Sequence, residues 1–183
     1  MARFVDDVGA EVPLPKEVLR VVSLVPSLTE ASAFSHPKEL VAATDWCTHP
    51  ADLDVLRALG IPVWVTDIRT VDQALASIET LLRAVGISDT GWLDQARNSW
   101  AQTPVVMECR RLRAVVPIWR RPWMHLGSDT YAGDVLRRLG VDNVLSDSPE
   151  RYPKLGLEHL PEVDLVVLPD EPYLFTETDG PKS

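Results

Sequence analysis

The residues of this sequence that are best suited to recognition are three tryptophans in predicted loops. Trp46 follows the apolar run 40–44, and Trp119 and Trp123 flank the dipeptide Arg120-Arg121 and a proline. None of the three falls on a periodic apolar stripe, so helix or strand packing does not require them. Rings with an apolar face and a polar edge suit a broad, flat, partly apolar ligand. We interpret them as walls of a ligand site; the alternative is that they fill an interface between two lobes.

Two arginines add polar chemistry beside two of these rings. The guanidinium groups of Arg120 and Arg121 can bind a carboxylate, amide or phosphate of a ligand in fixed bidentate geometry. The alternative is that both arginines balance the acidic pair Asp170 and Glu171, which follows a later strand. Either role requires the loops that carry these residues to converge.

Metal chemistry has weaker support in the sequence. Cys47 and His49 lie two residues apart, and His125 or Asp129 could complete a ligand set. No full metal-binding spacing is present. We therefore expect no metal site.

Enzymatic chemistry is also disfavoured. The turn after the first strand is Pro26-Ser27 rather than a Gly-rich loop, and proline removes an amide donor that a phosphate would need. The sequence has no nucleophile elbow either. We expect a protein that is not an enzyme. The alternative is a small cytosolic α/β hydrolase or metal-dependent enzyme that uses Ser27 or Cys47 with a histidine.

The elements that must position these residues alternate between strands and helices. Apolar runs bounded by turn residues predict strands at 20–25, 40–44, 61–66, 114–118 and 163–168. Apolar stripes and caps predict helices from Leu28, over 71–85 before Gly86, from Ser88 or Asp89 to a break at Thr103-Pro104, and over 129–139 before Gly140. A hairpin with Gly9 at its turn is predicted over 4–14, and a long loop over 119–127.

This order predicts an α/β fold with two small Rossmann-like lobes joined by a helical connector, and a ligand cleft between the lobes. We assign residues 1–70 to an N-terminal lobe, 71–112 to helices that include the connector, and 113–183 to a C-terminal lobe. Ligands of such sheets bind at the carboxyl ends of the strands. The predicted ligand-binding residues are therefore those of the loops after strands: Pro26, Ser27, Trp46, Trp119, Arg120, Trp123, Asp170 and Tyr173.

Composition excludes two classes of partner. The net charge of −9 disfavours nucleic acid, whose binding depends on clustered Lys and Arg. No apolar run approaches the ~20 residues that span a bilayer, and Met1 leads into Ala-Arg-Phe-Val rather than an export signal. The sequence as written therefore predicts a cytoplasmic location.

Several motifs, read in order, resemble one known family. They are Arg20-Val-Val-Ser-Leu-Val-Pro-Ser-Leu-Thr-Glu30, Val41-Ala-Ala-Thr-Asp-Trp-Cys47, Val116-Pro-Ile-Trp-Arg-Arg-Pro-Trp123, Gly127-Ser-Asp-Thr-Tyr-Ala-Gly-Asp134, Asn143-Val-Leu, Arg151-Tyr-Pro153 and Asp164-Leu-Val-Val-Leu-Pro-Asp-Glu-Pro172. Together they make the chain similar to the helical-backbone metal-receptor superfamily, the class III periplasmic solute-binding proteins, and within it to the cobalamin-binding branch.

The resemblance implies a ligand held between two lobes for an ABC importer. Cobalamin or a related corrinoid is the implied ligand, with a ferric siderophore or haem as the alternative. Trp46 and the loop 119–123 match the two aromatic walls of the family's cleft. Glu158 matches an acidic residue that docks onto a membrane permease, although a solvated helix residue explains it equally well. Family members are usually periplasmic or extracytoplasmic.

The chain also departs from the family pattern. Only residues 51–59 bridge His49-Pro50 and Gly60-Ile61, where the family has a further loop, helix and strand, and the chain stops at Ser183. The resemblance is thus to a shortened member. Fewer strands in a lobe predict an exposed sheet edge that favours association.

Overall fold

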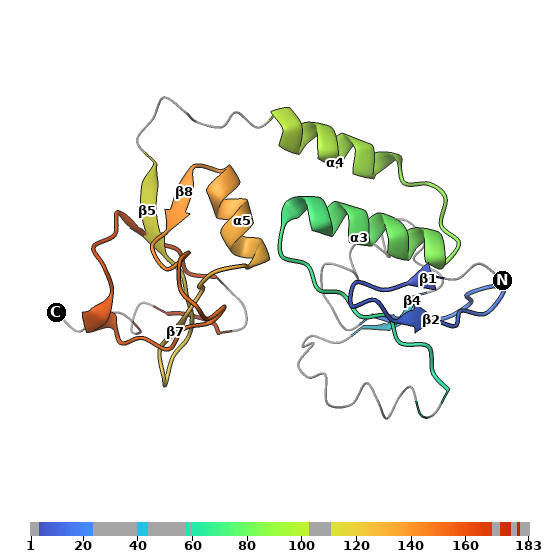
Figure 1. The fold of residues 1–183 in the computed structure, drawn as a ribbon, viewed down its shortest axis with the longest axis horizontal. Helices are drawn as coiled ribbons and strands as arrows, with labels where there is room; N and C mark the ends of the chain where they lie inside the picture. The colour runs from blue at the N-terminus through green and yellow to red at the C-terminus, as the bar shows by residue number, and fades with distance from the viewer. Residues whose placement is uncertain are drawn as a thin grey trace. The chain divides into compact units, whose positions relative to one another are not determined.

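The computed structural model describes residues 4–23, the backbone of 40–43, residues 58, 60–102, 111–169, 173–176 and 179. The chain forms two compact units, one of residues 1–68 with 72–100 and one of 69–71 with 101–183. Both units contain strands and helices (Figure 1), which confirms the predicted α/β class. The predicted lobe boundaries at 70 and 112 stay predictions.

The first unit begins with a short hairpin and a pair of parallel strands. Strands β1 (Phe4–Val5) and β2 (Glu11–Val12) pair antiparallel, and Gly9 takes the positive φ of 82° that their turn requires. Strands β3 (Val21–Ser23) and β4 (Leu40–Ala43) pair in parallel. The predicted hairpin over 4–14 is confirmed, as are the strands predicted at 20–25 and 40–44 over the described residues 21–23 and 40–43.

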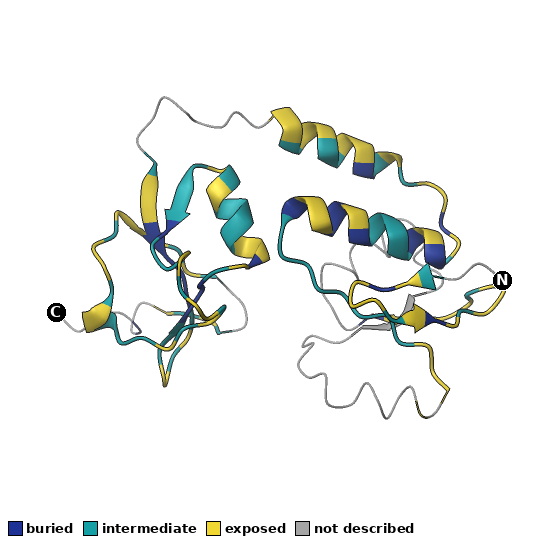
Figure 2. Ribbon diagram, in the orientation of Figure 1, coloured by how far each residue is buried: buried dark blue, intermediate teal, exposed yellow. Residues whose placement is uncertain are grey.

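Two helices follow. Helix α3 (Val71–Ala84) buries one stripe of its surface, including Val71, Leu75 and Leu82, and Figure 2 shows buried and exposed residues alternating along it. It ends before Gly86, whose φ is 87°. Helix α4 (Gly91–Gln102) buries Leu93 completely. Both helices were predicted from the spacing of their apolar residues.

The strand predicted at 61–66 is wrong, because this segment has no regular structure. Pro62 has no amide hydrogen to donate to a ladder. The amide of Val65 instead donates to the side chain of Asp6 (3.2 Å), and its carbonyl accepts from the amide of Asp7 (3.2 Å). The Asp6-Asp7 turn therefore takes the hydrogen bonds that a neighbouring strand would have used.

The second unit has a three-stranded parallel sheet in the order β8-β5-β9. Its strands are β5 (Leu112–Val115), β8 (Val141–Asn143) and β9 (Leu165–Val166), with helix α5 (Tyr131–Arg138) before β8. The sequence did not predict β8, which is only three residues long and includes Asp142 and Asn143. Helix α5 and the strand near 163–168 were predicted, and Gly140 ends the helix with a φ of 83°.

The long loop predicted over 119–127 is also wrong in part, because most of it is a hairpin. Strands β6 (Pro117–Trp119) and β7 (Met124–His125) pair antiparallel. The backbone of 153–155 then pairs with the other edge of β7 through the amide of His125 and the carbonyl of Pro153 (3.0 Å). A single 3-10 turn, η2 (Leu157–His159), follows.

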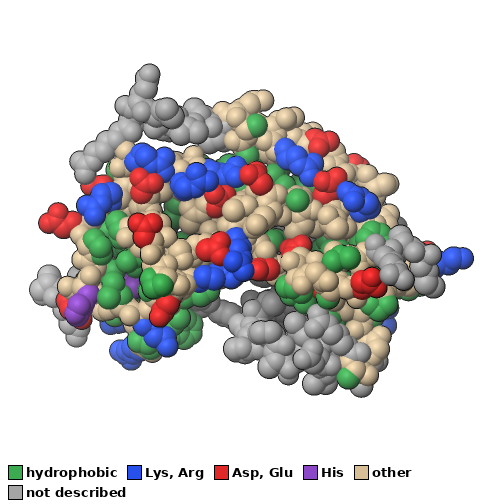
Figure 3. Space-filling view, viewed as in Figure 1, with side chains coloured by type: hydrophobic (Ala, Val, Ile, Leu, Met, Phe, Trp, Pro, Cys, Tyr) green, Lys and Arg blue, Asp and Glu red, His purple; other side chains and the backbone are tan. Residues whose placement is uncertain are grey.

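On the face of the molecule that Figure 3 shows, charges of both signs lie close together. On the two helices of the first unit, Arg83 pairs with Glu79 at 3.2 Å and Arg97 pairs with Asp94 at 3.0 Å. Such mixed charge gives no basic stripe of the kind that binds nucleic acid. No helix in the described part of the chain is long and apolar enough to cross a bilayer.

Candidate functional site

Four aromatic side chains of the second unit contact one another, and we call Trp119, Trp123, Tyr173 and Phe175 the aromatic cluster. The rings of Trp119 and Tyr173 meet edge to face with centroids 5.5 Å apart. The Tyr173 and Phe175 centroids are 4.7 Å apart, and Phe175 lies nearly parallel to Trp123 at 6.2 Å. The cluster thus presents ring faces and edges, and Trp119 remains 42% exposed. This is a surface that a flat apolar group can contact.

The cluster lies where the topology of the sheet predicts a site. The hairpin β6–β7, which carries both tryptophans, continues directly from the carboxyl end of β5. Tyr173 and Phe175 follow the carboxyl end of β9. Strands β5 and β9 are parallel neighbours, so their carboxyl ends lie at the same edge of the sheet, where ligands of α/β sheets bind.

Arg120 contacts an aromatic ring and a carboxylate. Its guanidinium carbon lies 5.7 Å from the centroid of the Trp123 ring, in a cation–π contact, and its Nη1 pairs with Oδ1 of Asp179. The alternative that Arg120 and Arg121 balance Asp170 and Glu171 stays a prediction, because the two acidic residues lie outside the described residues. The acidic partner that the structure shows is Asp179.

Asp179 is the most constrained carboxylate of this site. Its Oδ2 accepts hydrogen bonds from the amide (2.8 Å) and hydroxyl (2.9 Å) of Thr176, and its Oδ1 also accepts from the hydroxyl of Tyr173 (3.2 Å). These donors, the Thr176 amide foremost and Arg120 among them, lower the pKa of Asp179 to about 2. The carboxylate is therefore ionised at neutral pH.

His125 supports Trp123 from inside the unit. The two rings are nearly parallel, with centroids 6.4 Å apart, and His125 is 0% exposed. Its Nε2 lies 2.8 Å from the carbonyl oxygen of Leu155, which can only accept, so Nε2 carries the hydrogen. Burial lowers the pKa of His125, and the imidazole is neutral.

The structure brings together four of the predicted ligand-binding residues: Trp119, Arg120, Trp123 and Tyr173. The others, Pro26, Ser27, Trp46 and Asp170, lie outside the described residues, as do Cys47 and His49. Glu158 is exposed in η2 and accepts a hydrogen bond from Nδ1 of His159 (3.0 Å).

Sequence reasoning missed Phe175, Asp179 and the supporting role of His125. Phe175 could have been found, because in an extended segment it shares a face with Tyr173 two residues earlier. A threonine three residues before an aspartate is also a turn signal, here formed by Thr176 and Asp179 with an amide-to-carbonyl bond of 2.9 Å. Nothing in the sequence indicated that His125 would be buried.

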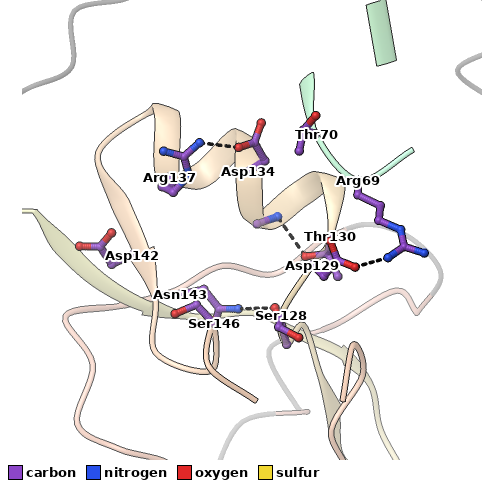
Figure 4. Close-up of a pocket in the computed structure, with 12 residues that line it drawn as sticks. Arg69, Thr70, Ser128, Asp129, Thr130, Asp134, Arg137, Asp142, Asn143 and Ser146 are labelled. Carbon is purple, nitrogen blue, oxygen red and sulfur yellow. Dashed lines mark hydrogen bonds and ion pairs between the residues drawn. The ribbon is translucent and has the colours of Figure 1, made fainter. Parts of the chain in front are cut away.

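A polar hollow of about 240 Å³ lies elsewhere in the second unit. It lies between residues 69–70, the loop 127–130, helix α5 and β8 (Figure 4). Each carboxylate that lines it has a guanidinium partner: Asp129 pairs with Arg69, Asp134 with Arg137 and Arg138, and Asp142 with Arg111. None of the described residues predicted to bind the ligand lines this hollow, although Asp129, weighed above as a metal ligand, does. The carboxylates of the hollow are thus paired within the unit.

The described residues contain no group of three or more His, Cys, Asp or Glu side chains that could hold a metal ion. The alternative metal site, Cys47 and His49 completed by His125 or Asp129, is therefore tested only in part. Of its described members, His125 is fully buried and Asp129 pairs with Arg69.

No protein-family model matches the sequence, and no curated protein sequence matches it. Several solved structures do match. Helicobacter pylori CeuE with Ni(II) bound aligns over 86% of this chain and 67% of its own, with 14% identity and a TM-score of 0.72. Haemophilus influenzae MolA bound to molybdate aligns over 92% and 74%, with 14% identity and a TM-score of 0.68. The periplasmic vitamin B12 binding protein BtuF of Vibrio cholerae aligns over 76% and 71%, with 17% identity and a TM-score of 0.54.

This chain has the fold of the class III periplasmic solute-binding proteins. The resemblance to the helical-backbone metal-receptor superfamily is thereby confirmed at the level of fold, as is the prediction of a two-lobed α/β architecture. Proteins of the class III fold carry different ligands, here nickel, molybdate and vitamin B12, so the fold does not select among them. BtuF is periplasmic, and the predicted cytoplasmic location has no support from these neighbours.

Proposed function

We propose that this protein is a non-catalytic solute-binding protein that captures cobalamin or a related flat metal chelate on its aromatic cluster. The observation that carries the proposal is the contact of Trp119, Trp123, Tyr173 and Phe175 at the carboxyl ends of β5 and β9. Aromatic faces bind broad conjugated rings through apolar contact, and each buried ring contributes a large area. The class III fold supports a binding role, and one neighbour is a vitamin B12 binding protein.

The test is a titration of the purified chain with cyanocobalamin. Binding should quench tryptophan emission and shift the corrin absorption bands. Trp123→Ala should weaken the affinity about tenfold or more, because it removes a central ring of the cluster. Trp100→Phe, on helix α4 of the other unit, is the matched control and should leave the affinity unchanged. Absence of quenching in the parent chain up to high micromolar ligand would refute the proposal.

A ferric siderophore or haem is the second candidate ligand, because the fold accommodates varied metal complexes. Arg120 would be the group that attracts their carboxylates or catecholates. The pairing of Arg120 with Asp179 disfavours these anionic ligands, because the guanidinium already has an anionic partner. Arg120→Ala compared with Trp123→Ala against a panel of chelates separates the two candidates.

The hydrolase alternative has no supporting contact among the described residues. His125 is fully buried and neutral with its Nε2–H engaged, so it is not positioned as an accessible general base. Esterase and phosphatase assays, together with metal analysis of the purified chain, test this alternative directly.

A membrane permease of the ABC class is the proposed partner, with Glu158 as the docking residue. The side chain is exposed and its carboxylate is ionised, since its hydrogen bonds lower its pKa. Charge reversal in Glu158→Lys should reduce cobalamin uptake in cells whose own cobalamin-binding protein is deleted, while cyanocobalamin affinity in vitro stays unchanged. Cobalamin uptake with Glu158→Lys equal to that with the parent chain would exclude this docking role.

A further inference from the structure

The charged pair Arg120–Asp179 lies beside the aromatic cluster, and its two side chains differ in their exposure to solvent. The Asp179 side chain is 9% exposed and the Arg120 side chain is 26% exposed. Both oxygens of Asp179 are occupied, Oδ1 by Arg120 and Tyr173 and Oδ2 by two donors of Thr176. The carboxylate is therefore fixed, and it cannot turn away when a ligand approaches.

This fixed carboxylate cancels the positive charge that Arg120 would otherwise offer beside Trp123. An anionic ligand that approaches Arg120 also approaches Asp179, and like charges in a partly buried site repel strongly. A ligand without net negative charge contacts the same rings without this repulsion. Contact with the aromatic faces then provides the affinity, and the charged pair provides the selectivity against anionic ligands.

We propose that Asp179 determines the charge class of the ligand, so that the site accepts flat chelates without net negative charge and rejects anionic ones. This inference rests on the proposed function, since it assumes that the aromatic cluster is the ligand surface. It extends that function by naming a specificity-determining residue that contacts Arg120, Tyr173 and Thr176.

Arg121, the exposed neighbour of Arg120, contributes little to the electrostatic potential at the site. It lies at the tip of the β6–β7 hairpin, where solvent and salt screen its charge. Arg121→Gln is therefore a useful control for a general change of charge near the site.

The experiment compares affinities for two planar chelates, cyanocobalamin, which has no net charge, and haemin, which has two carboxylates. The variants are Asp179→Asn, the double variant Asp179→Asn with Arg120→Gln, and the controls Thr176→Val and Arg121→Gln. Thr176→Val removes the hydroxyl donor, but the Thr176 amide, Tyr173 and Arg120 still hold Asp179, and both charges of the pair remain. Thermal unfolding of each variant confirms that it folds.

Asp179→Asn should raise the haemin affinity relative to cyanocobalamin by about tenfold or more, because it frees the charge of Arg120. The double variant should lose this gain, and both controls should keep the selectivity of the parent chain. The inference is overturned if Asp179→Asn leaves the ratio unchanged, or if Thr176→Val changes it equally.

A second pair of probes separates this inference from the proposed function. The anionic dye 8-anilinonaphthalene sulfonate and the uncharged dye Nile red bind exposed aromatic surface and do not depend on cobalamin recognition. If the parent chain binds neither chelate, the proposed function fails. The dye ratio then still decides the inference: a rise in Asp179→Asn that the double variant reverses supports it, and an unchanged ratio overturns it.

Discussion

Two buried titratable residues of the second unit, Asp179 and His125, are both deprotonated at neutral pH but differ in charge, because Asp179 is ionised and His125 is neutral. Asp179 receives hydrogen bonds from Thr176, Tyr173 and Arg120, and these donors favour the charged carboxylate. His125 has one hydrogen bond, to a carbonyl, and burial favours the neutral ring. The difference arises because several donors compensate the charge of the Asp179 carboxylate, whereas the described residues offer a charged His125 ring only one acceptor, the Leu155 carbonyl.

His125 makes the stability of the protein depend on pH. Its pKa is lowered in the folded state relative to the ordinary value of 6.5, so the unfolded chain binds a proton more readily. The free energy of unfolding contributed by His125 is therefore complete above pH 6.5 and falls as the pH drops toward the lowered pKa. Urea unfolding followed by circular dichroism at a series of pH values between about 7.5 and 5 measures this slope.

His125→Gln separates this titration from that of the carboxylates. Glutamine can still donate an N–H to the Leu155 carbonyl but does not titrate, so the dependence on pH should become shallower. The matched control is His159→Gln, since His159 is exposed and should leave the slope unchanged. A slope equal in the parent chain and in His125→Gln would contradict the prediction.

In the first unit, the Asp6 side chain accepts a hydrogen bond that the segment 61–66 would have donated to a neighbouring strand. Its buried carboxylate accepts from the amides of Val8 (3.2 Å), Ala10 (2.8 Å) and Val65 (3.2 Å). Asp6→Ala leaves three amides without their acceptor and should lower the free energy of unfolding by about 2 kcal/mol. Asp94→Ala on exposed α4 should change it by less than about 0.5 kcal/mol in the same denaturation assay. Equal losses in the two variants would show that the Asp6 bonds contribute nothing specific.

At the scale of elements, the packing of the second unit depends on a close backbone contact at Gly127. A Cβ atom added at Gly127 would lie 2.2 Å from the carbonyl oxygen of Glu150 and 3.0 Å from that of Arg151. The amide of Gly127 donates to the same Arg151 carbonyl at 2.8 Å. Only a residue without a side chain lets residues 150–151 approach the end of β7.

Gly127→Ala should therefore destabilise the protein by about 2–3 kcal/mol, because two backbone carbonyls must move. Gly91→Ala is the matched control, since its Cβ would lie at an ordinary 3.9 Å from Asp89. Because Gly91 opens α4, that variant should keep or slightly raise the melting temperature. A melting temperature of Gly127→Ala equal to that of the parent chain would exclude the steric argument.

The elements that the sequence predicted are those whose signals are local. Helices α3 and α5 follow from apolar spacing and from Gly86 and Gly140, which act within one turn. The segment 61–66 has the apolar run of a strand, but a side chain 59 residues away takes the amide of Val65. Local pattern cannot report such a competition, and it equally missed the short, polar β8.

The candidate site, like the fold, was predicted from the sequence only where the signal is local. Trp119 and Trp123 were predicted because loop tryptophans lack a packing role in their own element. Asp179 was missed because its importance comes from Arg120, which is 59 residues away in the sequence. The sequence therefore predicts the aromatic character of the candidate site, whereas the charge selectivity that we propose for it depends on tertiary contacts.

At the scale of the whole molecule, the edge strand β9 bears on association. Among the described residues β9 pairs only with β5, and Val166 and Leu168 are 51% and 55% exposed. The predicted exposed sheet edge stays a prediction. Open edges with apolar side chains favour strand-to-strand association, and a lysine on the edge opposes it.

Val166→Lys should therefore lower the self-association of the protein at high concentration, as measured by analytical ultracentrifugation. Leu139→Lys, at an equally exposed apolar residue after α5, is the control and should not change it. If the parent chain sediments as a monomer at all concentrations, the edge does not drive association.

The hydrogen bonds of the Asp6-Asp7 turn also determine when the first unit can complete its folding during synthesis. Asp6 bonds to Val65, and Asp7 bonds to Asp67 and to the hydroxyl of Ser77 at 2.7 Å, partners that lie 59 to 70 residues later in the chain. The parallel pairing of β5 with β8 joins residues only 29 apart, such as Leu112 and Val141. Loop closure over longer separations is slower, so residues 6–7, which are synthesised well before residues 65–77, gain these contacts late, whereas β5 and β8 are synthesised close together and can pair sooner.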